Sequence, residues 1–403
     1  MSAAALPKTS SIRALLPIMG IVLVAFLVVG MALPVLPLHV HQGLGLSAFV
    51  VGLVTGSQFA ASLLSRVWAG RYADRQGAKR AVITGLISAT VAGLLYLFSL
   101  FFIASPWISV SILLAGRALL GAAESFIITG AVSWGLSRAG AENAGRVIAW
   151  MGMAMFAALA LGAPVGTALF GVGGFLAIAA ATIVAPLVTV LFIGRLARTP
   201  AQESKRTDFA KIAGAVWMPG IGSALSSIGF GAMLAFSSLL FTEREWTPIW
   251  LPFSAFALAL VAARVTLGHL PDRVGGAKVA LASVLIEAAG LVLIWLANGP
   301  ALAATGAALT GFGYALVYPG LGAEAVRRAP PQSRGLAMGA YTVFLDVALG
   351  IGSPLLGIIA AWQGLGAVFL ASAILVLSSA MFAAILLAGG SESDRLPERR
   401  NVR

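Results

Sequence analysis

The strongest constraint on this chain is the regular recurrence of apolar runs, each about as long as a membrane is thick. A helix that crosses a bilayer needs roughly 20 mainly apolar residues, and runs of that kind follow one another along most of the 403 residues. Hydrophobic residues make up 60% of the chain and charged residues 10%, whereas soluble domains carry about 25% charged residues. The hydropathy therefore predicts an all-α membrane protein, although length alone would suggest about two or three soluble domains.

Short breaks of glycine, proline or charged residues divide the chain into twelve expected transmembrane helices. The first apolar run spans the bilayer and lacks a small-residue cleavage site, so we interpret it as a retained helix and not as a signal peptide. We place the helices near residues 14–40, 47–70, 81–103, 107–136, 146–170, 174–194, 214–241, 248–270, 278–297, 301–326, 335–362 and 366–388.

The basic residues predict the orientation. With both termini cytoplasmic, 24 of the 26 lysines and arginines fall in cytoplasmic segments, as the positive-inside rule requires. The exceptions are Arg117, inside a helix, and Arg244, in an outer loop. The net charge of +12 then belongs to the membrane face, and we expect no nucleic-acid partner. Cysteine is absent and the three histidines are scattered, so no disulfide or metal site is predicted.

The chain also repeats itself. Six identities recur at a spacing of 198 positions, pairing Arg66 with Arg264, Val67 with Val265, Gly70 with Gly268, Asp74 with Asp272, Arg75 with Arg273 and Gly77 with Gly275. A second set recurs at a spacing of 190, pairing Gly121 with Gly311, Gly145 with Gly335, Gly162 with Gly352 and Pro164 with Pro354. Parallel repeats of this kind are a transporter design. We expect two pseudo-symmetric six-helix bundles at 1–196 and 214–390, a cytoplasmic linker at 197–213 and a cytoplasmic tail at 391–403.

The run from Gly70 to Arg80 resembles the signature of the loop between helices two and three in the major facilitator superfamily (MFS). Within that superfamily, the stretches 55–80, 161–166 and 341–350 resemble bacterial arabinose-efflux-permease-like proteins. The resemblance implies two six-helix halves that alternate the access of a central site. Gly162, Pro164 and Gly166 loosely resemble a signature of proton-coupled drug exporters, which favours export weakly.

The resemblance also implies that both copies of the loop are gates. Asp74 is implied to dock at a helix N-terminus of the opposite half, whose partial positive charge attracts a carboxylate, and so to hold the cytoplasmic side closed. The alternative is that each aspartate only caps or ends its helix in a tight turn, with glycines where unusual backbone angles are needed. The expected gating residues are Arg66, Gly70, Asp74, Arg75, Gly77, Lys79, Arg80, Arg264, Gly268, Asp272, Arg273 and Gly275.

Arg117 and Glu124 lie within one expected span, where ionisable groups are costly and usually functional. Seven residues separate them, so they share a helix face about 10 Å apart along the axis. Leu113, Arg117 and Gly121 resemble the helix-four motif of the superfamily, whose arginine is implicated in proton transfer. We hypothesise that Glu124 carries the proton or the substrate charge and that Arg117 tunes it. The alternative is a structural ion pair. The repeat matches Glu124 to Tyr314, and the resemblance implies that both line the central cavity.

Two further acids lie inside expected spans. Asp346 is either a second protonation site or a hydrogen-bond acceptor at a helix crossing. Glu287 either pairs locally or sits protonated against lipid. Neutral polar and aromatic residues in the spans could bind a solute or serve helix packing. The possible substrate contacts are Gln58, Ser223, Ser226, Ser227, Phe230, Tyr314 and Tyr318.

These features predict a secondary active transporter of a small organic molecule, working by proton-coupled efflux in a bacterial cytoplasmic membrane. The alternatives are a proton-linked importer, an uncoupled facilitator and, more remotely, a non-transporting receptor or assembly factor. We expect a monomer in the lipid bilayer that uses the proton gradient and no cofactor. An enzyme is not expected, because the sequence shows no phosphate-binding loop, metal cluster or nucleophile–base pair.

Overall fold

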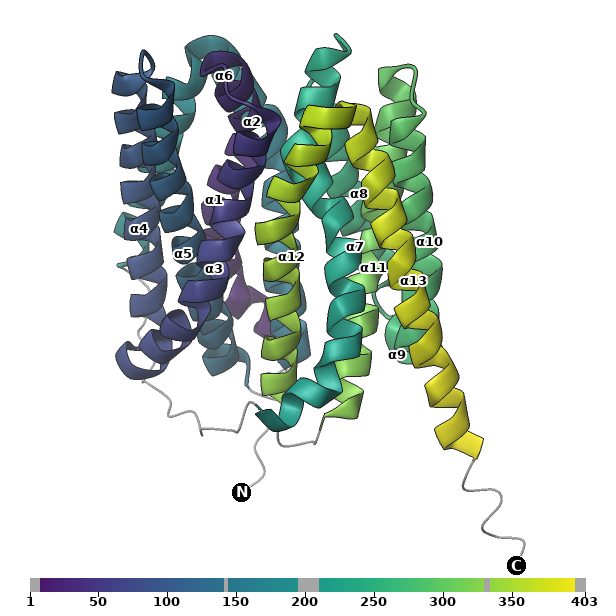
Figure 1. The fold of residues 1–403 in the computed structure, drawn as a ribbon. Helices are drawn as coiled ribbons and strands as arrows, with labels where there is room; N and C mark the ends of the chain where they lie inside the picture. Colours follow the sequence, from purple (N-terminus) through teal and green to yellow (C-terminus); the bar gives the residue numbers. More distant parts are fainter. Residues whose placement is uncertain (1–7, 141–143, 195–209, 330–333, 396–403) are drawn as a thin grey trace, which may run out of the picture. The chain divides into compact units, whose positions relative to one another are not determined.

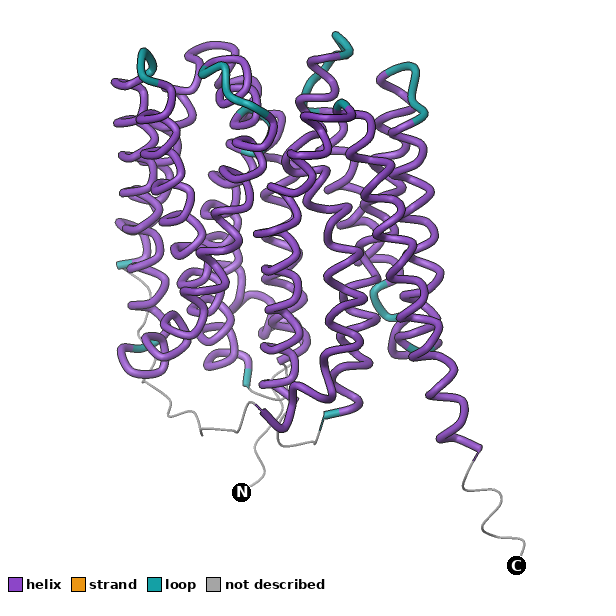
Figure 2. The backbone as a smooth tube through the Cα atoms, in the orientation of Figure 1, coloured by secondary structure: helices purple, strands orange, loops and turns teal. Residues whose placement is uncertain are grey.

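The computed structural model describes residues 8–140, 144–194, 210–329 and 334–395 (Figure 1). Helices joined by short loops make up this part of the chain (Figure 2). The first helices are α1 (Lys8–Ala32), α2 (Leu36–Leu38), α3 (Ala48–Gln76), α4 (Ala78–Ser99), α5 (Pro106–Ala139) and α6 (Ala144–Ile193), with a π-helical turn η1 (His39–Gly43) and a 3-10 turn η2 (Leu100–Phe102). The later helices are α7 (Ala210–Glu243), α8 (Leu251–Leu267), α9 (Leu270–Val274), α10 (Gly276–Trp295), α11 (Pro300–Arg328), α12 (Arg334–Gln363) and α13 (Leu365–Arg395).

The membrane-spanning stretches follow the expected spans to within a few residues, except that α3 continues beyond residue 70 to Gln76. Ten stretches of the described chain are long and apolar enough to cross a membrane, and α8 is a shorter apolar helix. The long α6 contains non-helical backbone at Gly173 and Gly174, between the two expected helices 146–170 and 174–194. Gly174 has a φ of +58°, which glycine adopts without the steric penalty of a side chain. The predicted interruption is therefore present, although the helical pattern runs across it.

The chain divides into two compact units. Unit 1 comprises Met1–Leu46 and Leu53–Lys205, and unit 2 comprises Ser47–Gly52 and Arg206–Arg403. Residues 195–209, which include most of the expected linker, lie outside the described ranges, as do residues 396–403 of the expected tail. Helix α7 already begins at Ala210, and α13 continues past residue 390 to Arg395.

Within each unit, small residues let helices pack closely. In unit 1, α4 packs on α5 and α6, and α1 packs on α6 and α5. In unit 2, α10 packs on α11 and α13, α7 on α12 and α13, and α8 on α11. Many large apolar side chains remain exposed, among them Leu64 (68%) and Leu191 (72%). Association of membrane helices depends on close packing of small residues rather than on hiding apolar surface, so such exposure fits a lipid-facing surface.

The sequence repeat has a counterpart in backbone geometry. A Cβ built on Gly121 of α5 would collide with the carbonyl of Gln58 on α3, and one built on Gly311 of α11 would collide with the carbonyl of Phe256 on α8. The two glycines are 190 positions apart, and Gln58 and Phe256 are 198 positions apart. The two spacings read from the sequence therefore describe one helix crossing that is built twice.

Candidate functional site

The crossing of α3 and α5 in unit 1 brings Gln58 and Glu124 together. Because Gly121 has no side chain, the two helices approach closely one turn before Glu124. The amide Nε2 of Gln58 donates a hydrogen bond to Oε1 of Glu124, and the exposed fractions of the two residues are 1% and 9%. Gln58 was expected among the substrate contacts. The structure makes it the direct partner of the expected proton site.

Arg117 lies on the same side of α5 and is fully buried. Its Nε donates to the carbonyl of Val54 at 3.4 Å, and its Nη1 donates to the hydroxyl of Tyr96 on α4 at 3.5 Å. Val54 and Gln58 are four residues apart on α3, so Arg117 and Glu124 contact successive turns of one helix. The predicted shared face of Arg117 and Glu124 is confirmed.

The guanidinium is incompletely satisfied. Its Nη2 has no hydrogen-bond partner among the described residues, and leaving a buried donor unpaired typically costs about 1–3 kcal/mol. A membrane protein keeps a buried cation of this kind mainly where it serves an ion or substrate path. The unpaired donor of Arg117 is therefore a stronger indication of a functional role than the position of this residue within a membrane helix.

A serine pair extends the same helix contact. Ser125 donates its hydroxyl to the carbonyl of Ser62 at 2.7 Å, and the two hydroxyls lie 3.0 Å apart. Sequence reasoning missed this pair and also missed Tyr96. The available signals were the spacing of Ser62, one turn after Gln58, and the scarcity of tyrosine, with five in the chain.

The corresponding crossing in unit 2 is aromatic. Phe230 of α7 stacks on Tyr314 of α11 and on Phe256 of α8, with ring centroids 5.1 and 5.4 Å apart. The hydroxyls of Ser227 and Tyr314 lie 3.3 Å apart, and Ser227 also donates to the carbonyl of Ser223. Four of the expected substrate contacts, Ser223, Ser227, Phe230 and Tyr314, are thus neighbours in one cluster.

Tyr318 belongs to a separate contact between α11 and α12. Its hydroxyl lies 2.8 Å from that of Thr342, and its carbonyl accepts a hydrogen bond from Tyr341, also at 2.8 Å. Asp346 follows Thr342 by one turn of α12 and is 3% exposed. Burial is compatible with both roles considered for Asp346.

Glu287 has a partner and no exposure. Ser226 of α7 donates to its Oε2 at 2.6 Å, and the residue is 0% exposed. The expectation of local pairing is confirmed, and the alternative of a side chain against lipid is wrong. Ser226, which was expected among the substrate contacts, is the hydrogen-bond partner of this acid.

The first gating loop departs partly from expectation. Gly77 and its repeat Gly275 have φ values of +90° and +104°, so these two glycines serve the turns as predicted. Gly70 and Asp74 were expected in the turn, yet they lie within the last turns of α3. The helix continues because no residue before Gly77 breaks it.

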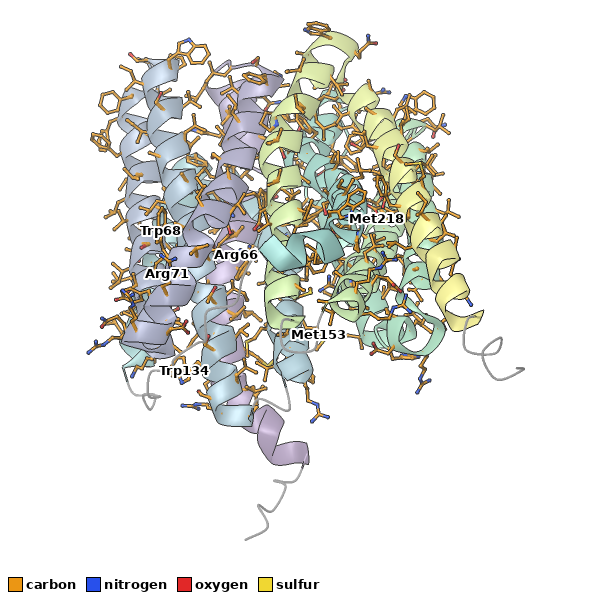
Figure 3. All side chains as sticks on the ribbon, turned by 60° about the horizontal axis from the view of Figure 1, so that its bottom comes forward. Arg66, Trp68, Arg71, Trp134, Met153 and Met218 are labelled. Carbon is orange, nitrogen blue, oxygen red and sulfur yellow. The ribbon has the colours of Figure 1, made fainter. Side chains whose placement is uncertain are left out.

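The basic residues around that loop have separate environments. Arg71 is exposed on α3 beside the exposed Trp68, whereas Arg66 is half-buried (Figure 3). Lys79 is buried and donates to the carbonyl of Gly194 at 3.2 Å, just after the end of α6. A lysine there complements the negative end of a helix dipole. Arg75 and Arg80 are both exposed, and Arg80 donates a hydrogen bond to the side chain of Gln76.

The second copy of the loop is arranged differently. Arg264 lies on α8 and donates to the carbonyl of Ala315 on α11 at 3.3 Å. Asp272 and Arg273 lie exposed on the short helix α9, which separates Gly268 from Gly275. The two copies have the same length, but α8 ends at Leu267 and the chain starts the new helix α9 at Leu270, with Pro271 at an early position, where proline is favoured.

Comparison with known proteins decides the family. The profile of the Major Facilitator Superfamily matches residues 18–253 and again residues 247–402. The chain belongs to the major facilitator superfamily. An uncharacterised MFS-type transporter of Salmonella typhimurium is 40% identical over 383 residues, which cover 95% of this chain and 99% of that protein. An uncharacterised MFS-type transporter of Burkholderia mallei is 40% identical over 371 residues, which cover 90% of this chain and 89% of that protein.

Solved MFS transporters share the fold at low identity. A bacterial homologue of the human lysosomal transporter Spinster is 14% identical with a TM-score of 0.74, over 94% of this chain and 97% of that one. The nucleoside transporter NupG is 15% identical with a TM-score of 0.73, over 93% of this chain and 99% of that one. The MFS protein described here is therefore a multi-pass membrane protein of the secondary transporter class, and not an enzyme.

Proposed function

We propose that this MFS protein exports a small organic molecule in exchange for protons, by alternating access of two six-helix halves. In this proposal twelve helices span a bacterial cytoplasmic membrane, counting the two parts of α6 separately, and both termini lie in the cytoplasm. The transporter works as a monomer, uses the proton gradient as its energy source and needs no cofactor.

The observation that carries the proposal is the buried contact between Glu124 and Gln58 on the face of α5 that also holds Arg117. Burial disfavours a charged carboxylate, whereas a nearby positive charge favours it. A site with both influences changes its proton occupancy when water enters or leaves. Glu124 is therefore assigned the proton that exchanges with substrate.

Gln58 suits both states of that carboxyl. Its Nε2 donates to Glu124, while its Oε1 has no hydrogen-bond partner among the described residues. A carboxamide offers a donor and an acceptor, so rotation of the amide lets Gln58 accept from a protonated Glu124. Glu124 then keeps a partner throughout the cycle.

The aromatic cluster of unit 2 supports an organic substrate. Phe230, Phe256 and Tyr314 form a stack of aromatic rings, and Ser227 adds a hydroxyl next to that of Tyr314. Ligand pockets combine apolar and aromatic walls with a few polar groups that fix orientation. A molecule with an apolar body and one or two hydrogen-bonding groups fits this chemistry.

Asp74 and Asp272 are proposed to hold the cytoplasmic gate. Asp74 lies in the last turn of α3 and Asp272 lies in α9, each just before the glycine of its turn. In this proposal the N-terminus of a helix in the other half binds the carboxylate. Asp74→Asn is expected to raise the inward-open population, seen as longer distances between spin labels on cytoplasmic loops. Unchanged distances would leave Asp74 with a capping role only.

The deciding experiment uses purified protein in liposomes with an acidic lumen and a trapped pH dye. Sugars, amino acids and cationic drugs are added outside, one at a time. Exchange of substrate for lumenal protons makes the lumen alkaline, and Glu124→Gln should abolish that signal. Glu243→Gln is the matched control, because Glu243 is an exposed carboxylate at the end of α7.

Each alternative gives a different result. An importer that carries protons with its substrate would acidify a neutral lumen when substrate and acid are supplied outside. An uncoupled facilitator would pass labelled substrate with no dye response and with equal rates for Glu124→Gln. A protein that moves no compound of the panel under any gradient would favour the receptor or assembly-factor alternative.

A further inference from the structure

Glu287 of α10 is a fully buried acid for which the proposed function has no role. Its Oε2 accepts a hydrogen bond from Ser226 at 2.6 Å. Its Oε1 has no hydrogen-bond partner in the described part of the chain. A buried carboxyl group with one oxygen unsatisfied is an expensive feature inside a membrane protein, so its position calls for a physical explanation.

The surroundings of Glu287 are shaped to hold a carboxyl group. Gly229 lies three residues after Ser226 on the same face of α7, and a Cβ there would come within 2.8 Å of Oε1. On the other side, Gly313 of α11 lets that helix approach the backbone of Glu287. The glycines of α7 and α11 thus leave room for the carboxyl group of α10, and any side chain at position 229 would displace that group.

No basic side chain described on α7, α10, α11 or α13 accompanies this acid. Lys278 of α10 is exposed nine residues before Glu287, and Arg327 and Arg328 lie in the last turn of α11. From α11 the nearby titratable group is Tyr314, whose hydroxyl meets Ser227, while α13 contributes the apolar Val376 beside Gly229. Arg264 of α8 donates to the carbonyl of Ala315. Arg264 is bonded to that carbonyl, and no cation contacts Glu287 among the described residues of the elements named above, so the acid is stable there as the protonated carboxyl group and ionises only where water reaches it.

We propose that Glu287 is a second proton-binding site, in unit 2, whose proton is released and rebound as α7 moves relative to α10. While α7 and α10 are in contact, Ser226 holds the protonated carboxyl group by a hydrogen bond and Gly229 leaves room for it. When water reaches the site, the proton leaves and the ionised group favours the separated arrangement. Because α7 also carries Ser227 and Phe230, the same movement changes the aromatic cluster around Tyr314. The site goes beyond the proposed function, since it needs neither Glu124 nor export.

Infrared difference spectroscopy of the reconstituted protein tests the proposal without measuring transport. The pH is stepped from about 5 to about 10, a range that covers buried glutamates, and the carbonyl band of protonated carboxylic acids is followed. We expect a band that decreases as the pH rises and is absent from Glu287→Gln. In Ser226→Ala the same band should move to higher frequency, because its carbonyl loses a hydrogen bond. Glu124→Gln should leave this band in place, so failure of one site is distinguishable from failure of the other.

Two glycine variants keep the test decisive if Glu287→Gln folds poorly. Gly229→Ala places a methyl group against Oε1 and should shift the titrating band, whereas Gly214→Ala, on the same helix with open space around it, should leave the band unchanged. A Glu287 band that persists unchanged over the whole pH range would mean a permanently protonated structural acid. The complete absence of such a band would mean a permanently ionised one. Either result overturns the proposal.

Discussion

The two units build the same helix crossing and fill it with opposite chemistry. In unit 1 the crossing at Gly121 joins Gln58 to Glu124, whereas in unit 2 the crossing at Gly311 lies beside Phe256 and Tyr314. Beside the second crossing, a buried acid comes from another helix, because Gly313 of α11 packs against the backbone of Glu287 of α10. Backbone geometry has thus been kept by the repeat while side-chain chemistry has diverged.

This contrast separates what stabilises the fold from what performs transport. A position that is glycine in both units serves packing, because a side chain there would collide with a neighbouring helix in each. A position that is charged in one unit and aromatic in the other is not needed for packing. The crossing therefore does not require the polar group at Glu124 for packing, and the proposed proton-binding role accounts for it.

The largest expected effect comes from giving unit 1 the chemistry of unit 2. The double change Gln58→Phe with Glu124→Tyr should still fold, because the second crossing accommodates that pair on the same backbone. Proton-linked transport should fall by about 100-fold or more, the usual effect of losing a proton-transfer group. Liposome assays and thermal unfolding in detergent measure the two quantities separately. Retained proton coupling would show that the difference between the crossings has no functional meaning.

The reverse exchange is the control. Phe256→Gln with Tyr314→Glu places a carboxyl group where unit 2 has Ala307 in the position of Arg117. Without that cation the new acid should reduce thermal stability more than the first exchange does. Equal stability of the two exchanged proteins would mean that Arg117 contributes little to the tolerance of Glu124.

A smaller and symmetric effect is expected at the two crossing glycines. Gly121→Ala and Gly311→Ala should each lower the free energy of unfolding by about 1–3 kcal/mol, the typical cost of overpacking a close contact. Gly339→Ala is the control, because position 339 of α12 is exposed with open space around it, and alanine there favours the helix by about 1 kcal/mol. Unequal losses at the two crossings would break the geometric equivalence of the units.

The sequence could predict the helices and the repeat, because both are written in local patterns. Apolar runs of bilayer length set the spans, and the positive φ of Gly77 and Gly275 follows from their place between two helices. The end of α3 was predicted too early, at residue 70, since the charged residues up to Gln76 look like a loop while still fitting a helix.

Partners across helices could not be predicted in the same way. A membrane helix is apolar almost all round, so its pattern does not say which neighbour a polar residue meets. The sequence could therefore not say that Gln58 meets Glu124 of α5, and it could not decide whether Glu287 pairs locally or faces lipid, which the hydrogen bond from Ser226 of α7 decides. The pairing of Arg117 and Glu124 on one face was predictable because it lies within a single helix.

The smallest expected effect tests whether the aromatic crossing of unit 2 has any polar role. Ser227→Ala removes the hydroxyl that lies 3.3 Å from that of Tyr314. A single neutral hydrogen bond is worth about 0.5–1.5 kcal/mol, so substrate affinity should weaken by a few-fold and at most about tenfold. Ser237→Ala is the matched control on the same helix, because Ser237 is also buried and its hydroxyl donates to the carbonyl of Met233 on its own helix. If both variants bind substrate as the unmodified protein does, the second crossing is purely a packing element, and the polar contacts of the substrate must come from other residues.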